Sequence, residues 1–148
     1  MSQTVTVSLE RKGKVFDLDT QCMALGKIHV DPDLLPENER SGTAKRMLGA
    51  SILYCFIGSF ADALQARGAT FEKITGEAVV TAGDDGTGRR RILGVGLKVS
   101  VFMDEAFSGV YEHVAKIMRK GCLVSASVEK AFPVTYDLTL VTVHSAGA

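Results

Sequence analysis

The residues best suited to do chemistry in this chain are two cysteines, Cys55 and Cys122. Cys55 lies within residues 47–61, a run without charged residues that is predicted to form part of a long helix. Cys122 follows Gly121 at the predicted end of another helix, and it could open a short helix whose free backbone N–H groups would favour a thiolate. A reactive thiol in an apolar environment, with a second thiol to form a disulfide with it, is the minimum equipment for reducing peroxides.

Each cysteine also has a purely structural interpretation. A cysteine in an apolar helix is most often an inert small hydrophobic residue, and Cys122 could be only a buried turn residue. Ser51, Cys55 and Ser59 are spaced four residues apart and share one helix face. That stripe is either a polar lining beside the thiol or a small-residue surface where two helices approach closely. Cys22, in an early strand region, is better explained as structural than as a third redox centre.

Length and composition exclude several classes of protein. The 148 residues suit one domain, spanning 1–148, and 17 basic residues balance 17 acidic ones, so no net field would attract nucleic acid or an anionic membrane. Three cysteines are too few for a disulfide scaffold, and the N-terminus lacks a signal peptide, so we expect a cytoplasmic protein. The uncharged run is shorter than the roughly 20 residues that span a bilayer, so it is predicted to be a buried helix. The histidines lack the spacing of metal ligands, and we expect neither a metal nor a cofactor.

The periodicity of apolar residues predicts an α+β fold. The expected elements are, in order, a hairpin over residues 5–18, a short strand within 24–30, a loop over 31–41, a helix from Thr43 to before Gly68, strands over 71–82 and 91–103, a helix from Asp104 to Gly121, and a strand over 134–140. The central helix is apolar on nearly every face and needs more cover than one chain of this size provides. We therefore expect a homodimer.

Two stretches resemble the osmotically inducible protein C / organic hydroperoxide resistance (OsmC/Ohr) family. Residues 42–56 are similar to the family's stretch of small and apolar residues that ends in Cys-Phe, here Cys55-Phe56. Residues 121–125, Gly-Cys-Leu-Val-Ser, are similar to its Gly/Asn-Cys-Pro-x-Ser motif. The resemblance implies an OsmC-like fold, with antiparallel strands wrapped around a long apolar central helix. It also implies an intertwined homodimer whose two central helices lie back to back, with active sites at the subunit interface.

The implied activity is reduction of organic hydroperoxides. Cys55 would be the peroxidatic thiolate and would become a sulfenic acid, and Cys122 would condense with it to a disulfide. A dithiol reductant of the lipoyl or thioredoxin type would restore both thiols. The family's thiolate is stabilised by an arginine, for which Arg11 and Arg40 are the candidates here. The expected apolar substrate pocket is formed by Met47, Ile52, Phe56 and Phe60.

The chain departs from the family pattern at two positions. Lys45 stands ten residues before Cys55, where the family has a glutamate that holds the activating arginine, and Leu123 replaces the usual proline after the second cysteine. A second interpretation is therefore a non-catalytic or redox-sensing OsmC-like dimer with an apolar ligand pocket at its interface. Lys45 favours this alternative, whereas the retained cysteine pair favours the peroxidase.

Overall fold

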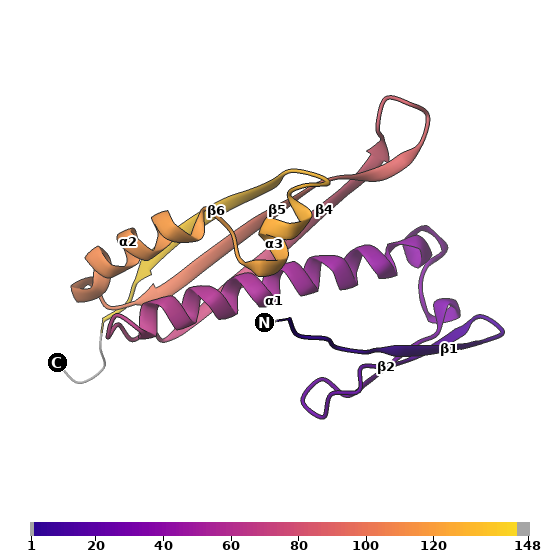
Figure 1. Ribbon diagram of the computed structural model, residues 1–148, viewed down its shortest axis with the longest axis horizontal. Coiled ribbons are helices and arrows are strands. Elements are labelled where there is room, and N and C mark those ends of the chain that lie inside the picture. Colours follow the sequence, from indigo (N-terminus) through magenta and orange to yellow (C-terminus); the bar gives the residue numbers. More distant parts are fainter. Residues whose placement is uncertain (1, 145–148) are drawn as a thin grey trace. The chain divides into compact units, whose positions relative to one another are not determined.

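The structure is a computed structural model that describes residues 2–144, and it contains two compact units, Met1–Thr43 and Ala44–Ala148 (Figure 1). Each unit has its own three-stranded sheet. The strands of the first unit are β1 (Ser8–Lys12), β2 (Val15–Asp19) and β3 (Lys27–Val30), and those of the second are β4 (Lys73–Asp84), β5 (Arg90–Met103) and β6 (Val134–Thr142). The mixture of strands and helices confirms the predicted α+β class.

The first unit is an antiparallel sheet in the order β1-β2-β3. Its first two strands form the expected hairpin, in which Gly13 adopts a positive φ of 63° that suits glycine. The third strand begins at Lys27 rather than Ala24, because residues 22–26 form a turn in which Gly26 N–H donates to Cys22 O over 2.7 Å. The expected loop over residues 31–41 contains two 3-10 helices, Pro32–Leu34 and Glu37–Gly42.

The long helix α1 (Thr43–Gln65) begins and ends near the predicted positions. Gly68, with φ of 75°, ends it, and Ala69 N–H donates to Leu64 O just beyond its last turn. Its fully buried side chains fall four residues apart on one stripe: Ile52, Phe56, Phe60 and Leu64. On the outer side Tyr54 is 84% exposed, so the expected burial on nearly all sides is wrong for the chain by itself. The helical segment Glu37–Gln65 is long and apolar enough to cross a bilayer, a criterion that core helices of soluble proteins also meet.

The second sheet has the order β4-β5-β6 and mixes strand directions. The first pair is an antiparallel hairpin, whereas β6 runs parallel to β5, from Val95 opposite Val134 to Met103 opposite Thr142. The expectation of antiparallel strands throughout is therefore wrong. The chain returns to the sheet through the helices α2 (Ser108–Met118) and α3 (Leu123–Val128), and such a crossover brings the next strand back in the same direction.

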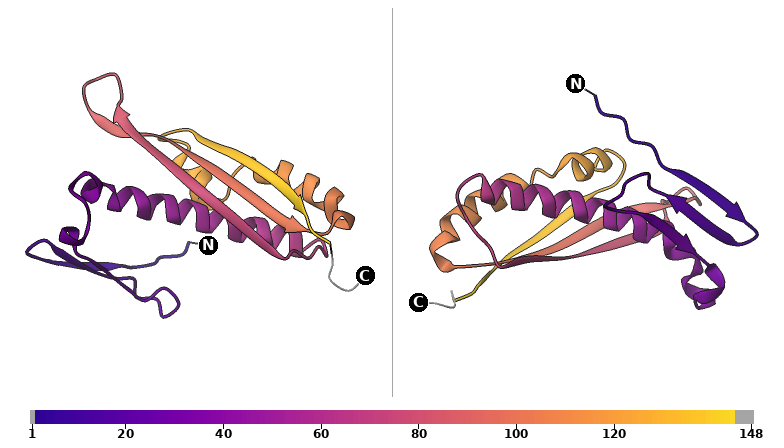
Figure 2. Two further views of the ribbon diagram at one scale, coloured as in Figure 1. Left: turned by 180° about the vertical axis from the view of Figure 1, so that it is seen from behind. Right: turned by 90° about the horizontal axis from the view of Figure 1, so that it is seen from below.

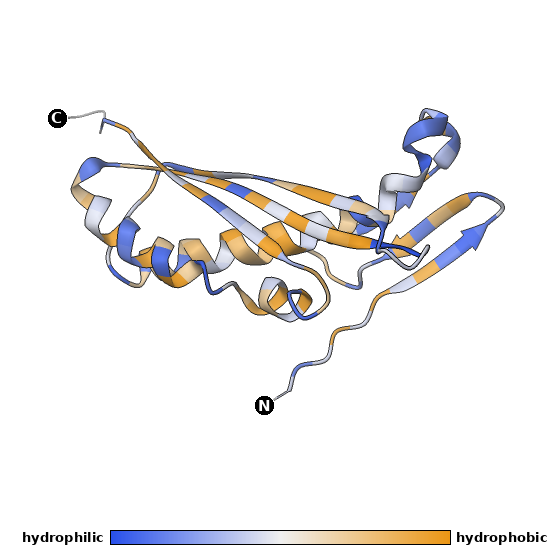
Figure 3. Cartoon of the chain, turned by 90° about the horizontal axis from the view of Figure 1, so that it is seen from above, coloured by the Kyte–Doolittle hydropathy of each residue, from blue (hydrophilic) through white to orange (hydrophobic). Residues whose placement is uncertain are grey.

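The core of the second unit lies between this sheet and the helices on one of its faces, as Figures 2 and 3 show. The predicted buried face of β5 is confirmed, because its five residues are at most 2% exposed: Val95, Leu97, Val99, Val101 and Met103. Gly76 of β4 lets α1 approach closely, since a Cβ there would lie 2.7 Å from Ile57 Cδ1 and 2.8 Å from Leu53 Cδ1. Within the second unit, the strands therefore form a layer on one side of α1.

Candidate functional site

Cys122 opens α3 as its N-terminal cap, as predicted. Its sulfur accepts the Ser125 N–H over 3.4 Å, and the Ser125 hydroxyl accepts the Cys122 N–H over 2.9 Å, which completes a reciprocal capping box. The preceding Gly121 has φ of 89°, a conformation that ends α2 and turns the chain into α3. Cys122 is only 7% exposed, so local capping and burial hold this thiol in place.

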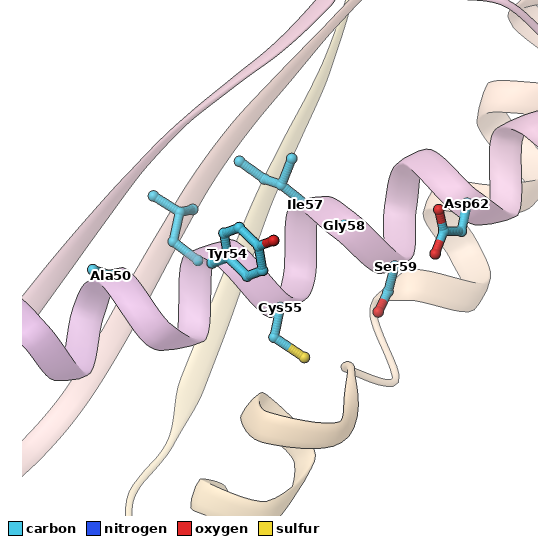
Figure 4. A pocket seen from close by; sticks show the side chains of 8 residues that line it. Ala50, Tyr54, Cys55, Ile57, Gly58, Ser59 and Asp62 are labelled. Carbon is cyan, nitrogen blue, oxygen red and sulfur yellow. The ribbon is translucent and has the colours of Figure 1, made fainter. Parts of the chain in front are cut away.

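Cys55 lies in the middle of α1, where it is half-buried and borders an open cavity of about 750 Å³. All the residues that line the cavity belong to α1, and most are apolar or small: Ala50, Leu53, Tyr54, Cys55, Ile57, Gly58, Ser59 and Asp62. In Figure 4 the Cys55 and Ser59 side chains extend from the same side of the helix. One helix forms a single wall, so within this unit the cavity is open opposite that wall.

The thiols of Cys55 and Cys122 lie close together although the two residues are far apart in the sequence. Both are free cysteines, and their sulfur atoms are close enough for each thiol to influence the pKa of the other. The backbone N–H of Val124 favours the thiolate of both. The arrangement therefore pairs an accessible thiol on α1 with a buried thiol on α3, and two such thiols can exchange between dithiol and disulfide.

The environment shifts the pKa values of the two thiols in opposite directions. Burial has the largest effect on Cys55 and raises its pKa, despite a hydrogen bond from Ser59 that favours the thiolate. Burial also has the largest effect on Cys122, but the hydrogen bonds from the Ser125 side chain and backbone, together with those from Cys55 and Val124, outweigh it and lower the pKa of Cys122. Cys122 is thus the more acidic thiol, whereas Cys55 is the more accessible one.

Two residues that the sequence did not suggest extend the site. Tyr136 of β6 places its hydroxyl 2.9 Å from Ser125 Oγ and 2.7 Å from Glu129 Oε1. Its ring stacks on Phe56 with centroids 5.1 Å apart, so it rests on the same helix that carries Cys55. Burial raises the pKa of Tyr136 to about 12, and the adjacent Glu129 carboxylate adds to this effect. The only signal for this network in the sequence was Ser125 at the end of the Gly-Cys-Leu-Val-Ser stretch.

Comparison with known proteins identifies the family. Residues 37–137, more than half of the chain, match the OsmC-like protein family. The chain belongs to this family. No curated protein matched the sequence. The family match includes both cysteines and the whole of α1.

Solved structures share the OsmC-like fold at low sequence identity. A hypothetical protein from Aquifex aeolicus has a TM-score of 0.72 at 16% identity, with 97% of this chain and 100% of that chain covered. An OsmC-like protein from Mycoplasma pneumoniae has a TM-score of 0.72 at 13% identity, with coverage of 95% and 99%. The organic hydroperoxide resistance protein OhrB of Bacillus subtilis has a TM-score of 0.60 at 14% identity, with coverage of 92% and 98%.

The substrate pocket expected for an OsmC-like peroxidase differs from the cavity beside Cys55. Ile52, Phe56 and Phe60 are fully buried in the core, on the stripe of α1 that faces the sheet. Met47 is 37% exposed and also does not line the cavity. A long uncharged helix gives little periodic signal for which side faces the core, so the sequence did not show that these three residues face the sheet. Their role in a substrate pocket stays a prediction.

The candidate activating arginines both belong to the first unit. Arg11 Nε donates to Gly13 O over 3.0 Å, and its guanidinium lies 5.2 Å from the centre of the Phe16 ring. Arg40 Nε donates to Leu35 O over 3.2 Å. Their role toward Cys55 stays a prediction. Among residues 2–144, no group of three His, Cys, Asp or Glu side chains is placed to hold a metal ion.

Proposed function

We propose that this OsmC-like protein is a cysteine-based peroxidase that reduces organic hydroperoxides. The observation that carries the proposal is the pairing of an accessible Cys55 thiol, at an apolar cavity, with the buried Cys122 thiol. Accessibility supports the proposed roles, because a hydroperoxide can reach the half-buried Cys55 more easily than Cys122. The name of the structurally similar OhrB, an organic hydroperoxide resistance protein, agrees with this proposal.

The reaction has two chemical steps. The Cys55 thiolate attacks the terminal oxygen of the hydroperoxide, the O–O bond breaks, and the alkoxide leaves as an alcohol after taking up a proton. The Cys122 sulfur then attacks the resulting sulfenic acid, which forms the disulfide and releases water. A dithiol of the lipoyl or thioredoxin type would reduce the disulfide, and the proposed compartment is the cytoplasm, where such reductants keep thiols reduced.

The first step needs a means to ionise Cys55. Burial raises the pKa of this thiol, so the proposed mechanism needs a positively charged group that favours the thiolate. Arg11 and Arg40 are the proposed sources, as a guanidinium beside a thiol favours the thiolate. The family match extends across the boundary between the two units, which supports a single OsmC-like domain over residues 1–148.

The proposal is tested with cumene hydroperoxide and an excess of a dithiol such as dihydrolipoamide. We expect many turnovers per protein, and in the absence of the dithiol a disulfide between Cys55 and Cys122 that mass spectrometry can locate. Hydrogen peroxide should react more slowly, because it gains nothing from apolar cavity walls. If no peroxide is consumed and no disulfide forms, the protein is instead the non-catalytic binder that Lys45 favours. A disulfide that forms once, without turnover under the dithiol, would indicate the redox-sensing alternative.

We also propose that the protein is a homodimer in which a second copy covers the outer face of α1. Tyr54 of α1 and Leu123 of α3 are 84% and 81% exposed, so two large, mainly apolar side chains are available for contact with a second copy. Tyr54 also lines the cavity beside Cys55, which has only the wall that α1 supplies. A second copy would bury these side chains and close the cavity, as expected for an active site at a subunit interface.

Sedimentation at micromolar concentration should give a dimer. Tyr54→Glu places a charge in the proposed interface and should shift the equilibrium to the monomer by at least about tenfold, roughly 1.4 kcal/mol. Val79→Glu is the matched control, because Val79 is 60% exposed and lies on β4 at a position that points away from α1. A monomeric parent protein, or equal effects of the two changes, would contradict the proposed interface.

A further inference from the structure

A chain of hydroxyl groups connects the buried Cys122 with the protein surface. Cys122 Sγ lies 3.4 Å from Ser125 Oγ, which lies 2.9 Å from Tyr136 Oη, and this in turn lies 2.7 Å from Glu129 Oε1. Ser125 is fully buried, whereas Glu129 is exposed. The chain therefore starts at a thiol with little access to water and ends at a carboxylate in solvent.

The hydrogen bonds in this series of hydroxyl groups can all run in one direction. A tyrosine hydroxyl has one proton and a carboxylate can only accept, so Tyr136 donates to Glu129. The hydrogen bond between Ser125 and Tyr136 then has to run from Ser125. The Ser125 oxygen is left to accept from the Cys122 thiol as well as from the Cys122 N–H. Each proton thus already points toward Glu129.

The surrounding packing fixes these atoms in place. A Cβ at residue 121 would lie 2.7 Å from Ser125 Oγ and 2.9 Å from Tyr136 Oη, so only glycine leaves room for the two hydroxyls. The Tyr136 ring stacks on Phe56, which is fully buried. The Ser125 and Tyr136 hydroxyls therefore have little freedom to break these hydrogen bonds, as an efficient proton path requires.

We propose that Ser125, Tyr136 and Glu129 form a relay that removes the thiol proton of Cys122 while the disulfide closes. The inference rests on the proposed peroxidase function and concerns its second step. The Cys122 proton moves to Ser125 as the Ser125 proton moves to Tyr136 and the Tyr136 proton moves to Glu129. The Cys122 thiolate attacks the sulfenic sulfur of Cys55, the S–O bond breaks, and the hydroxide takes a proton from water. Glu129 then releases its proton to solvent, so the balance is sulfenic acid plus thiol giving disulfide plus water.

The pKa shifts of Cys122 and Tyr136 suit their places in the relay. Hydrogen bonds from Ser125 help to lower the pKa of Cys122, because after the transfer its hydroxyl points back at the thiolate. Burial raises the pKa of Tyr136 to about 12, so the phenol stays protonated and passes protons on rather than acting as a base. The base at the end of the chain is the solvent-exposed Glu129.

The experiment compares the two steps in Tyr136→Phe and Glu129→Gln. One equivalent of cumene hydroperoxide is mixed with the reduced protein and samples are quenched over time. A dimedone-type probe measures the Cys55 sulfenic acid, and mass spectrometry measures the disulfide. We expect the sulfenic acid to form at the parent rate and the disulfide to form at least about tenfold more slowly, a lower bound that is smaller than the roughly hundredfold or more that positioned proton transfer usually contributes.

The pH profile separates a relay from a structural support. Without the relay, Cys122 has to lose its proton directly to solvent, so the deficit of both variants should be largest at low pH and shrink as pH rises. Ser127→Ala and Tyr111→Phe are the matched controls, because neither residue belongs to the relay. The Ser127 hydroxyl donates to Leu123 O, and the Tyr111 ring stacks on Phe60. Both should close the disulfide at the parent rate.

The outcomes distinguish this relay from the proposed function. Normal formation of the sulfenic acid in the variants, with disulfide closure at the parent rate at every pH, would overturn the relay and leave the peroxidase intact. A deficit that does not change with pH would also overturn it, because that result indicates misplaced sulfur atoms. Absence of the sulfenic acid in the parent protein would overturn the peroxidase function, and this step with it.

Discussion

Replacement of Cys55 by serine should lower the rate of organic hydroperoxide reduction by at least about a thousandfold, equivalent to about 4 kcal/mol in the barrier. A serine hydroxyl is a far weaker nucleophile toward the O–O bond than a thiolate at neutral pH. Two thiols remain in this variant. Cys122 is 7% exposed and cannot take over an attack on a bulky substrate, and Cys22, although exposed, has no second cysteine in its own unit with which to form a disulfide. The measurement is the initial rate of cumene hydroperoxide consumption with an excess of dithiol.

Cys122→Ser is the matched change and should fail in a different way. The variant keeps the accessible thiol, so it should reduce one equivalent of peroxide and leave a sulfenic acid on Cys55, which a dimedone-type probe can trap. It cannot form the intramolecular disulfide. If both serine variants consumed peroxide as the parent does, and the parent formed no peroxide-dependent disulfide, the peroxidase proposal would be refuted.

Phe56→Ala should lower the free energy of unfolding by about 3–5 kcal/mol, the usual cost of removing a buried phenylalanine. Phe56 is fully buried, packs edge-on against Phe60 with centroids 6.0 Å apart, and stacks on Tyr136. Urea or guanidinium unfolding of the reduced protein measures the change. The loss of the stacked ring should also make the position of the Tyr136 hydroxyl less well fixed.

His113→Ala is the control for this stability prediction. It removes an exposed ring from α2 and should change the free energy of unfolding by less than about 0.5 kcal/mol. An equal loss of stability in the two variants would contradict the assignment of Phe56 to the core of the second unit. A loss below about 1 kcal/mol for Phe56→Ala would mean that the surrounding side chains collapse into the space that the ring leaves.

The predicted local elements depended on short-range patterns and were largely confirmed. Alternation along β5 identified the buried face from Val95 to Met103, because side chains on a strand point to opposite faces in turn. Glycines marked the end of α1 and the passage from α2 to α3, since Gly68 and Gly121 both adopt positive φ. The position of Cys122 at the start of a short helix followed from the same rule. Each of these signals acts over only a few residues, so the sequence contains it directly.

The orientation of α1 and the direction of β6 were decided only by the tertiary structure. Residues 47–61 have no charged residue to mark an outer face, so no periodicity showed that Ile52 and Phe56 face the sheet while Tyr54 faces outward. The strand pattern of β6 is the same for parallel and antiparallel pairing, and its direction depends on how α2 and α3 carry the chain back across the sheet.

The site likewise contains some residues that the sequence marked and others that only the tertiary structure brought there. Sequence similarity marked the two cysteines and the serine that caps with Cys122, since these positions carry the motifs. Tyr136 and Glu129 came to the site through the packing of β6 and the end of α3, with no recognisable spacing from either thiol. Local capping fixes the position of Cys122. The hydrogen bond between Ser125 and Tyr136 depends instead on the register of β6 beside β5. That pairing joins distant segments and forms only when the whole sheet is assembled.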